Sequence, residues 1–185
     1  GDLAIIQLIS ETTHTMAEGE VFQLLKCGDA GITEEDYFTL IEKKTAVLIA
    51  AACAVGALMA GASPDRVEAL RAFGHAMGLA FQLTDDTLDY VAAEKEFGKA
   101  IGMDIREGKI TLPLIRTLAR CTAGEKETIR GIVERKQATD EDIAAVFGLI
   151  GKYDGIPYAL DRARTIIADG KARLAPFRDG EAKAA

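Results

Sequence analysis

A stretch without charged side chains, AVLIAAACAVGALMAGA from Ala46 to Ala62, sets the strongest limit on the fold of this chain. Its length is near the minimum for a helix that spans a membrane. However, it consists mainly of Ala and Gly, which give only a modest energy of transfer into lipid, and Lys43 and Lys44 directly precede it. We therefore predict a buried central helix, whose small side chains allow neighbouring helices to pack closely.

The composition indicates a single all-α domain over residues 1–185, which is long enough to bury a hydrophobic core. Hydrophobic residues make up 49% of the chain, there are four prolines, and no Asn-Gly hairpin signal occurs. The net charge of −7 argues against a nucleic-acid surface. The three cysteines are far apart and lack metal-ligand spacing, so we expect reduced thiols in the core and a cytoplasmic protein.

Helical periodicity and capping signals divide the chain into about seven helices with short loops between them. The sequence predicts no strand and therefore an all-α bundle. A segment rich in glycine and charge, residues 94–108, is expected to be irregular. The predicted helices run from Leu3 to about Lys26, from Thr33 to about Ala60 and from Ser63-Pro64 through the aspartates described below; others start at Thr111, Thr122 and Thr139, and the last runs from about Pro157 to Leu174.

Three aspartates, Asp85, Asp86 and Asp89, lie within an apolar helical pattern. Asp is unfavourable inside a helix and carboxylates on adjacent turns repel each other, so this arrangement requires a compensating interaction. Asp85 and Asp89 project from one face, and Asp86 is an i+3 neighbour of Asp89. Converging carboxylates suit Mg²⁺, which bridges a few carboxylates to substrate phosphates. The alternative, a helix N-cap or a solvated acidic face, explains one aspartate but not three within an apolar pattern.

The segment GKAIGMDIREGKITLP extends this pattern with two Gly-Lys pairs. Glycine lets the backbone come close to a ligand, and Lys99 and Lys109 supply point charges for phosphate. Lys44-Thr45, before the Ala-rich run, and Gln82, one turn before the aspartates, are further candidates for phosphate binding. Taken singly, the alternatives are a solvated loop, a lysine that extends to solvent at a helix end, and an amide in a core polar network.

Several motifs occur together in one order: Ala17-Glu18-Gly19-Glu20, Glu42-Lys43-Lys44-Thr45, the run from Phe81 to Tyr90, Gly98-Lys99, and the segment from Gly108 to Pro113. In this combination the chain resembles the trans-type polyprenyl diphosphate synthases. The resemblance covers essentially the whole chain but only about the C-terminal half of a family member. We therefore expect an incomplete, isoprenoid-synthase-type helical bundle that is part of a longer protein.

The resemblance implies a Mg²⁺-dependent, head-to-tail condensation of isopentenyl diphosphate onto an allylic diphosphate. Asp85 would bind Mg²⁺ directly, with help from Asp86 and Asp89. The residues implied to act in catalysis are Asp85, Asp86 and Lys99, and those implied to hold the allylic diphosphate are Lys44, Thr45, Gln82, Lys99 and Lys109. In such a site Mg²⁺ and lysines stabilise the negative charge that develops on the leaving diphosphate, and a dry apolar cavity protects the carbocation.

The sequence departs from the family pattern in two ways. The earlier Asp-rich motif with its pair of arginines, and the basic residues that hold isopentenyl diphosphate, do not occur in it. The chain is therefore expected to carry part of the active site and to be inactive alone. Many family members also have Gln where Glu20 stands. The Glu form resembles long-chain synthases, octaprenyl- or decaprenyl-like, whose product serves as a side chain of a quinone such as ubiquinone. A homodimer is expected, as is common in the family.

Two other functions fit part of the pattern. A non-catalytic partner subunit of a heteromeric prenyl synthase is the main alternative, but such partners lack Asp-rich motifs, whereas the aspartates and both Gly-Lys pairs are present here. A related Mg²⁺-dependent terpene cyclase is the other alternative. The GKITLP segment and Lys44-Thr45 argue against it.

Overall fold

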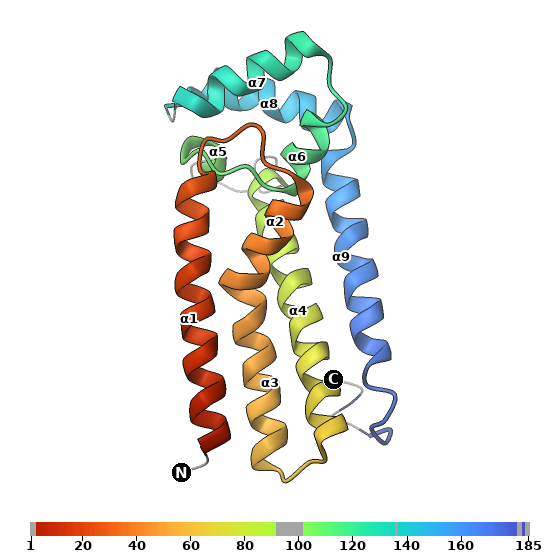
Figure 1. Ribbon diagram of the computed structural model, residues 1–185. Helices are drawn as coiled ribbons and strands as arrows, with labels where there is room; N and C mark the ends of the chain where they lie inside the picture. The colour runs from red at the N-terminus through yellow and green to blue at the C-terminus, as the bar shows by residue number, and fades with distance from the viewer. Residues whose placement is uncertain (1–2, 92–101, 136, 181–182, 184–185) are drawn as a thin grey trace. The chain divides into compact units, whose positions relative to one another are not determined.

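The computed structural model describes residues 3–91, 102–135, 137–180 and 183. These residues form helices and connecting turns, with no strand among them, and the all-α prediction is confirmed. Figure 1 shows the elements in chain order: α1 (Leu3–Lys26), α2 (Glu34–Ile41), η1 (Glu42–Ala46), α3 (Val47–Met59), α4 (Pro64–Val91), α5 (Met103–Arg106), α6 (Leu112–Leu118), α7 (Ala123–Arg135), α8 (Asp140–Lys152) and α9 (Gly155–Ala172).

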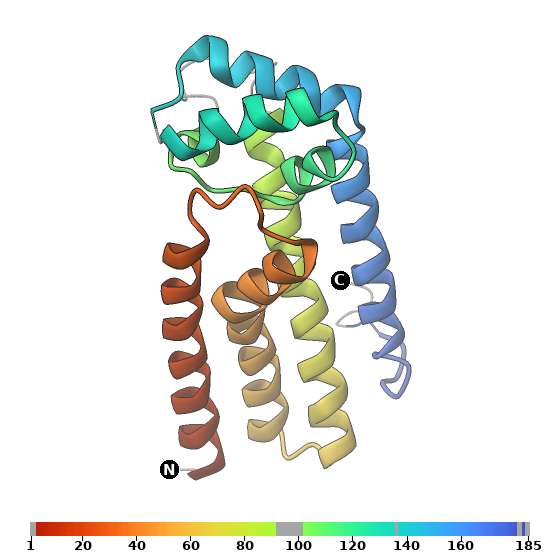
Figure 2. The same cartoon turned by 45° about the horizontal axis from the view of Figure 1, so that its top comes forward.

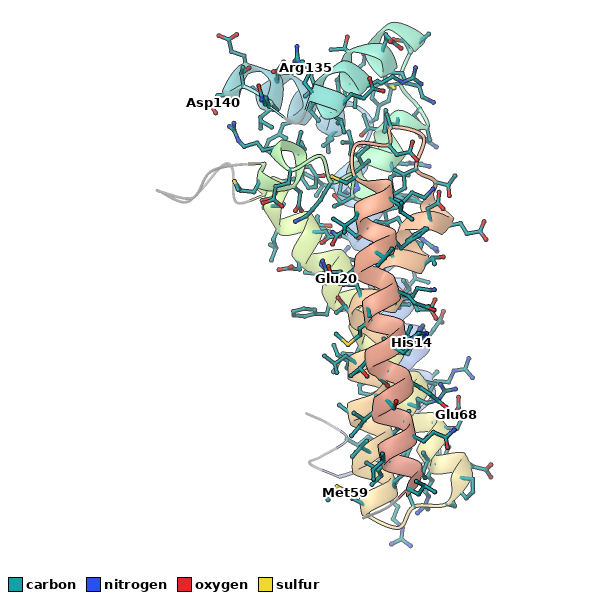
Figure 3. The ribbon with its side chains drawn as sticks, turned by 60° about the vertical axis from the view of Figure 1, so that its left-hand side comes forward. His14, Glu20, Met59, Glu68, Arg135 and Asp140 are labelled. Atoms are coloured by element: carbon teal, nitrogen blue, oxygen red, sulfur yellow. The ribbon has the colours of Figure 1, made fainter. Side chains whose placement is uncertain are left out.

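The helix starts follow the capping signals of the sequence. In the capping box of α8, the backbone N–H of Asp142 donates to Thr139 and the Asp142 carboxylate accepts from the Thr139 backbone N–H. The same reciprocal pair joins Thr33 to Asp36 before α2 and Thr122 to Glu125 at α7. Each box satisfies backbone donors that a helix start leaves unpaired. Figure 3 labels Arg135 and Asp140, which end α7 and begin α8.

Two segments differ from the sequence prediction. The helix expected from Thr33 to Ala60 contains a turn of π-helix, η1, because the backbone widens by one residue there. Residues 103–106, expected to be irregular, form the short helix α5, and that prediction was wrong. Gly102 and Gly108 flank α5 with positive φ, and the helical turn places Ile105 in the core with 0% exposure. Hydrophobic burial therefore decides the conformation of this glycine-rich segment.

The chain divides into two compact units, which are described separately. Unit 1 comprises Gly1–Val21, Leu40–Gln82 and Ala163–Ala185, and unit 2 comprises Phe22–Thr39 and Leu83–Arg162. In Figures 1 and 2, α3 lies beside α1 and α4 within unit 1, and α7 lies beside α8 within unit 2. The organisation of residues 1–185 as a single domain stays a prediction.

Small residues form the core of unit 1. The uncharged run forms a helix that is buried on one side only: Ala46, Ala50, Ala51, Ala54 and Ala57 are each at most 6% exposed, whereas Leu48 is 49% and Met59 77% exposed, so the prediction of a buried helix holds for one face. Its neighbours contribute glycines at the points of closest approach: a Cβ added at Gly78 of α4 would lie 2.5 Å from the Cα of Ala46. Among the described residues, no helix is both long and apolar enough to cross a membrane.

Larger side chains fill the core of unit 2. Tyr37 and Leu83 are each 1% exposed, and the Tyr90 ring packs on Phe147 with 5.5 Å between ring centroids. The aliphatic side chains of α6, α7 and α8 complete this core. The cysteines of both units are free, as expected, but they are partly exposed rather than buried in the core.

Glu125 gives unit 2 a stability that depends on pH. Hydrogen bonds from Lys152 and Tyr153, both 2.6 Å, and from Thr122 lower the pKa of Glu125 to about 2. A depressed carboxyl pKa stabilises the fold above the ordinary value of 4.5, and this contribution is lost as the pH falls from there toward 2.

We expect Glu125→Gln to melt lower than wild type at neutral pH and to lose less melting temperature on acidification. Thermal melting between pH 7 and about pH 2 measures both. Glu127→Gln, on the same helix but 73% exposed, is the control; parallel curves for wild type and Glu125→Gln would refute the assignment.

Candidate functional site

The three aspartates lie in the last two turns of α4, in unit 2. The buried side of this segment carries Leu83, Thr87 and Tyr90, each at most 4% exposed. Asp86 and Asp89 are partly buried beside this strip, whereas Asp85 is exposed. Asp85 and Asp89 are one turn apart on the same face, as expected from their i, i+4 spacing. The helix therefore turns one carboxylate toward solvent and keeps two at the edge of the core.

Asp86 is held by a tyrosine from another helix. The Tyr37 hydroxyl of α2 donates a hydrogen bond of 2.6 Å to Asp86 Oδ2. Burial, followed by the negative charge of Asp86, raises the pKa of Tyr37 well above its ordinary value, so the phenol stays protonated and remains a donor. The sequence gives no signal for this contact, since 49 positions separate the two side chains and no local spacing relates them.

Asp104 of α5 is a further carboxylate at this place. Its backbone N–H lies 3.3 Å from Asp89 Oδ2, and its side chain is 19% exposed. Burial, followed by the charge of Asp89, raises the pKa of Asp104. The carboxylates of Asp89 and Asp104 therefore lie near each other. The sequence contains a signal for Asp104, an acidic residue within the glycine-rich segment between the aspartates and Lys109, although no role was predicted for it.

Lys109 lies beside these carboxylates in unit 2. Its ammonium group is 2.6 Å from Glu107 Oε2 and 3.3 Å from Asp104 Oδ1. Burial alone would lower the pKa of Lys109, but the Glu107 hydrogen bond and the charge of Asp104 outweigh burial and raise it. The carbonyl oxygen of the preceding Gly108 accepts a 2.8 Å hydrogen bond from Gly28 N–H, which fixes the backbone there. The other predicted loop lysine, Lys99, lies outside the described residues.

Lys44, Thr45 and Gln82 form a second group, in unit 1. The turn of π-helix η1 carries Lys44 and Thr45, and such turns are frequent at functional sites. Thr45 Oγ1 donates a 2.8 Å hydrogen bond to Gln82 Oε1. This bond orients the Gln82 amide so that its NH₂ group points away from Thr45 as a donor. Gln82 belongs to α4, the helix that carries the aspartates in its following turns.

Glu20 pairs with Lys44 in this group. The Lys44 ammonium lies 3.5 Å from Glu20 Oε1, with side-chain exposures of 33% and 61%. Figure 3 labels Glu20 on α1. The close approach of α1 to η1 depends on Gly19, since a Cβ there would lie 2.9 Å from the Lys44 backbone nitrogen. The two motifs recognised in the sequence, Gly19-Glu20 and Lys44-Thr45, are thus in direct contact.

A cavity elsewhere in unit 1 contains none of the predicted site residues. Its volume is about 580 Å³, and α1, α3, α4 and α9 line it, with Ala50, Ala76 and Gly170 on its walls. Glu68, labelled in Figure 3, and Arg71 also line it and pair with each other at 2.8 Å. The cavity is lined by small side chains together with acidic and basic ones, the latter including His75 and Arg173.

The carboxylates at the end of α4 suit a hard divalent cation whose other ligands are waters and substrate phosphates. Across residues 3–91, 102–135, 137–180 and 183, no three His, Cys, Asp or Glu side chains form a group that could hold a metal ion. Mg²⁺, however, usually keeps waters and binds through one or two carboxylates plus substrate phosphates. The Tyr37 donor is neutral and does not itself neutralise Asp86. Burial first, and then the nearby charge of Asp89, raises the pKa of Asp104, and a cation bound there would offset both.

Comparison with known proteins identifies the family to which this all-α chain is similar. The polyprenyl synthetase family model matches residues 1–150. Octaprenyl diphosphate synthase from Escherichia coli is 41% identical over 135 residues, which are 73% of this chain and 42% of the relative. A short chain isoprenyl diphosphate synthase from Methanothermobacter thermautotrophicus is 38% identical over 180 residues, 97% of this chain and 55% of the relative.

A solved structure agrees with these relatives. Polyprenyl synthase from Caulobacter crescentus, crystallised with calcium and isoprenyl diphosphate, superimposes with a TM-score of 0.90 at 37% identity and covers 97% of this chain and 55% of that one. The fold is therefore that of the all-α isoprenoid synthases. The chain belongs to the polyprenyl synthetase family, and it spans about half the length of the relatives it matches.

Proposed function

We propose that this protein catalyses the Mg²⁺-dependent, head-to-tail condensation of isopentenyl diphosphate onto an allylic diphosphate. The observation that carries the proposal is the acidic end of α4, in which Asp86 is fixed by Tyr37 and Asp89 adjoins Asp104, within a chain that belongs to the polyprenyl synthetase family. The calcium and isoprenyl diphosphate bound to the Caulobacter crescentus relative support a site for a divalent cation and a diphosphate.

In this proposal the side chains divide into two roles. Asp85, Asp86 and Asp89 hold Mg²⁺, which when bound to the diphosphate neutralises its negative charge and makes it a better leaving group. Lys44, Lys99 and Lys109 bind the diphosphate oxygens as point charges. Thr45 acts mainly through Gln82, because its hydroxyl hydrogen is already donated to the amide oxygen. Lys109 exchanges its present carboxylate partners for the more highly charged diphosphate.

We propose a long all-trans polyprenyl product, of octaprenyl or decaprenyl length, which serves as a quinone side-chain precursor. Glu20 and the identity to the E. coli octaprenyl diphosphate synthase support a long product; the short chain relative is the reason for a test. Protein from the complete gene is incubated with farnesyl diphosphate, isopentenyl diphosphate and Mg²⁺, and product masses are measured. A series ending near eight to ten isoprene units is the expected result, and termination at geranylgeranyl length would refute the long product.

The alternative is a non-catalytic partner subunit of a heteromeric prenyl synthase. Such a partner has no need to bind Mg²⁺ and diphosphate, whereas a synthase is stabilised by them through linkage, by about 2.7 kcal/mol at a concentration of 100 times Kd. Thermal melting with saturating Mg²⁺ and inorganic pyrophosphate separates the two. An unmoved melting temperature, with elongation only after a second chain is added, would favour the partner subunit.

We also propose a cytoplasmic homodimer. The negative net charge and free cysteines support a cytoplasmic location. In unit 1, Leu3, Ile6 and Ile9 of α1 are 50–77% exposed, which supports a self-association surface on this helix. Native mass measurement at several concentrations tests the dimer, and a monomer at all of them would refute it.

Glu20 is expected to weaken diphosphate binding by competing for Lys44. Glu20→Gln removes the carboxylate that competes with the diphosphate for Lys44, so we expect pyrophosphate to bind about threefold to fivefold tighter in the presence of Mg²⁺. The melting temperature should hardly change, because an exposed ion pair contributes little to stability. Calorimetric titration measures the affinity.

Glu18→Gln is the matched control for this prediction. It removes an equal charge from α1 and breaks an ion pair of 2.8 Å to Lys43, but Lys43 is not a predicted site residue. An equal gain in both variants would mean that only the net charge matters and would contradict a specific role for Glu20.

A further inference from the structure

We propose that Tyr37 is a positioning residue for Asp86: its buried phenol fixes the carboxylate in the orientation that cation binding requires. This inference rests on the proposed function, and it adds a residue that lies 49 positions away from the acidic motif. Tyr37 is 1% exposed, and its hydroxyl lies 2.6 Å from Asp86 Oδ2. Both residues belong to unit 2.

The start of α2 holds Tyr37 in a defined place. Asp36, the preceding residue, closes the capping box with Thr33 and accepts a 3.0 Å hydrogen bond from Lys26. Glu34, the first residue of α2, accepts a 2.8 Å hydrogen bond from the Tyr158 hydroxyl. A side chain on such an anchored turn loses little further freedom when it forms a hydrogen bond. Tyr37 therefore transmits a fixed geometry to Asp86.

Arg162 reinforces the same turn from α9. Its guanidinium lies 3.2 Å from Glu34 Oε1 and 5.1 Å from the centroid of the Phe38 ring, and Phe38 packs edge-on against Tyr37 with 5.9 Å between ring centroids. These contacts are independent of the aspartates. The rigidity of the Tyr37 ring thus does not depend on whether a cation is bound.

The chemistry of a phenol suits this task. A lysine or arginine at this position would hold Asp86 but would also neutralise it, which would reduce its attraction for a cation. The Tyr37 hydroxyl is neutral, so it orients one carboxylate oxygen and leaves the full negative charge on Asp86. The same bond opposes the repulsion from Asp85 and Asp89, which otherwise favours rotation of the Asp86 side chain toward solvent.

Tyr90 provides a matched control. It is also a buried tyrosine of unit 2, 4% exposed, and its hydroxyl makes a hydrogen bond of 2.6 Å. Its partner, however, is the Thr111 hydroxyl rather than a carboxylate. Tyr37→Phe and Tyr90→Phe each delete one buried hydroxyl and should lower the melting temperature by similar amounts. Only Tyr37→Phe should weaken cation binding.

The test is a Mg²⁺ titration of protein from the complete gene at saturating inorganic pyrophosphate. The melting temperature is measured at each Mg²⁺ concentration. We expect Tyr37→Phe to need about tenfold more Mg²⁺ for half of the maximal shift, since a hydrogen bond to a charged group is lost. Tyr90→Phe should need the same Mg²⁺ as wild type. In an Asp86→Asn background, adding Tyr37→Phe should cause no further change, because Tyr37 acts through that carboxylate.

The outcomes separate this inference from the proposed function. If wild type shows no shift with Mg²⁺ and pyrophosphate, both are overturned. If wild type responds and Asp86→Asn weakens the response, while Tyr37→Phe behaves like wild type, the function stands and the role of Tyr37 is overturned. Equal weakening in Tyr37→Phe and Tyr90→Phe, or an undiminished effect of Tyr37→Phe in the Asp86→Asn background, would show a merely structural role and would also overturn it.

Discussion

Replacement of Asp85 by asparagine is expected to slow chain elongation by on the order of 10³-fold, because the proposed reaction depends on a full carboxylate charge to hold Mg²⁺ at the leaving diphosphate. The side chain is exposed and lies on the face of α4 away from the buried strip of Leu83, Thr87 and Tyr90. A change at such a surface position normally alters the free energy of unfolding by less than about 0.5 kcal/mol. The melting temperature should therefore stay near that of wild type, or rise slightly as repulsion from Asp86 is relieved.

Asp65→Asn is the matched control for this loss. Asp65 is exposed in the first turn of the same helix, so the substitution removes an equal charge far along α4 from the acidic cluster. Initial rates of isopentenyl diphosphate incorporation, measured over a range of Mg²⁺ concentrations, give the comparison. Rates that fall equally in both variants, or an Asp85→Asn enzyme as fast as wild type, would contradict the assignment of Asp85 as a metal ligand.

Features set by local sequence were predicted well. The helix from Leu3 to Lys26 and the capping boxes at Thr33, Thr122 and Thr139 follow from signals within a few residues. The Ala-rich run is helical as predicted, but only one of its faces is buried. The all-α fold was predicted from helical periodicity and capping signals, which are also local. The family was predicted from short motifs that lie in a fixed order.

Features set by contacts between distant segments were missed. Nothing near Tyr37 in the sequence shows that its hydroxyl lies on Asp86, and nothing near Glu20 shows that it reaches Lys44. The glycines before α5 suggested a loop, whereas the burial of Ile105 produced a helical turn. Which carboxylates bind the cation and which lysines bind the diphosphate stay predictions, because both depend on a ligand that brings phosphate oxygens of its own.

The glycines of α4 link the fold to the proposed diphosphate-binding group in unit 1, Lys44, Thr45 and Gln82. At Gly78 an added Cβ would lie 2.5 Å from the Ala46 Cα, which is closer than Cβ atoms approach in real structures, and 3.1 Å from the Ala46 Cβ, which is a tight contact. Ala46 directly follows Thr45, whose hydroxyl holds Gln82 at 2.8 Å. Close packing at this helix crossing thus fixes the position of the Thr45–Gln82 pair, and a change in packing should reach the proposed site.

We accordingly expect Gly78→Ala to destabilise the protein by about 1–3 kcal/mol, the typical cost of overpacking a core, and to lower the melting temperature by roughly 2–12 °C. The displaced Ala46 should also shift Thr45 and weaken pyrophosphate binding. Thermal melting and calorimetric titration measure the two effects.

Gly56→Ala is the control from α3, the helix that begins directly after Ala46. An added Cβ there would meet nothing within 4 Å, so the substitution should raise stability by about 0.5–1 kcal/mol through higher helix propensity. The two substitutions are chemically identical. If Gly78→Ala lowers the stability and Gly56→Ala raises it, contact with Ala46 rather than helix propensity decides the outcome at Gly78. If both variants melted above wild type, α3 and α4 would have to be further apart at this crossing, and the Thr45–Gln82 pair would lose its structural support.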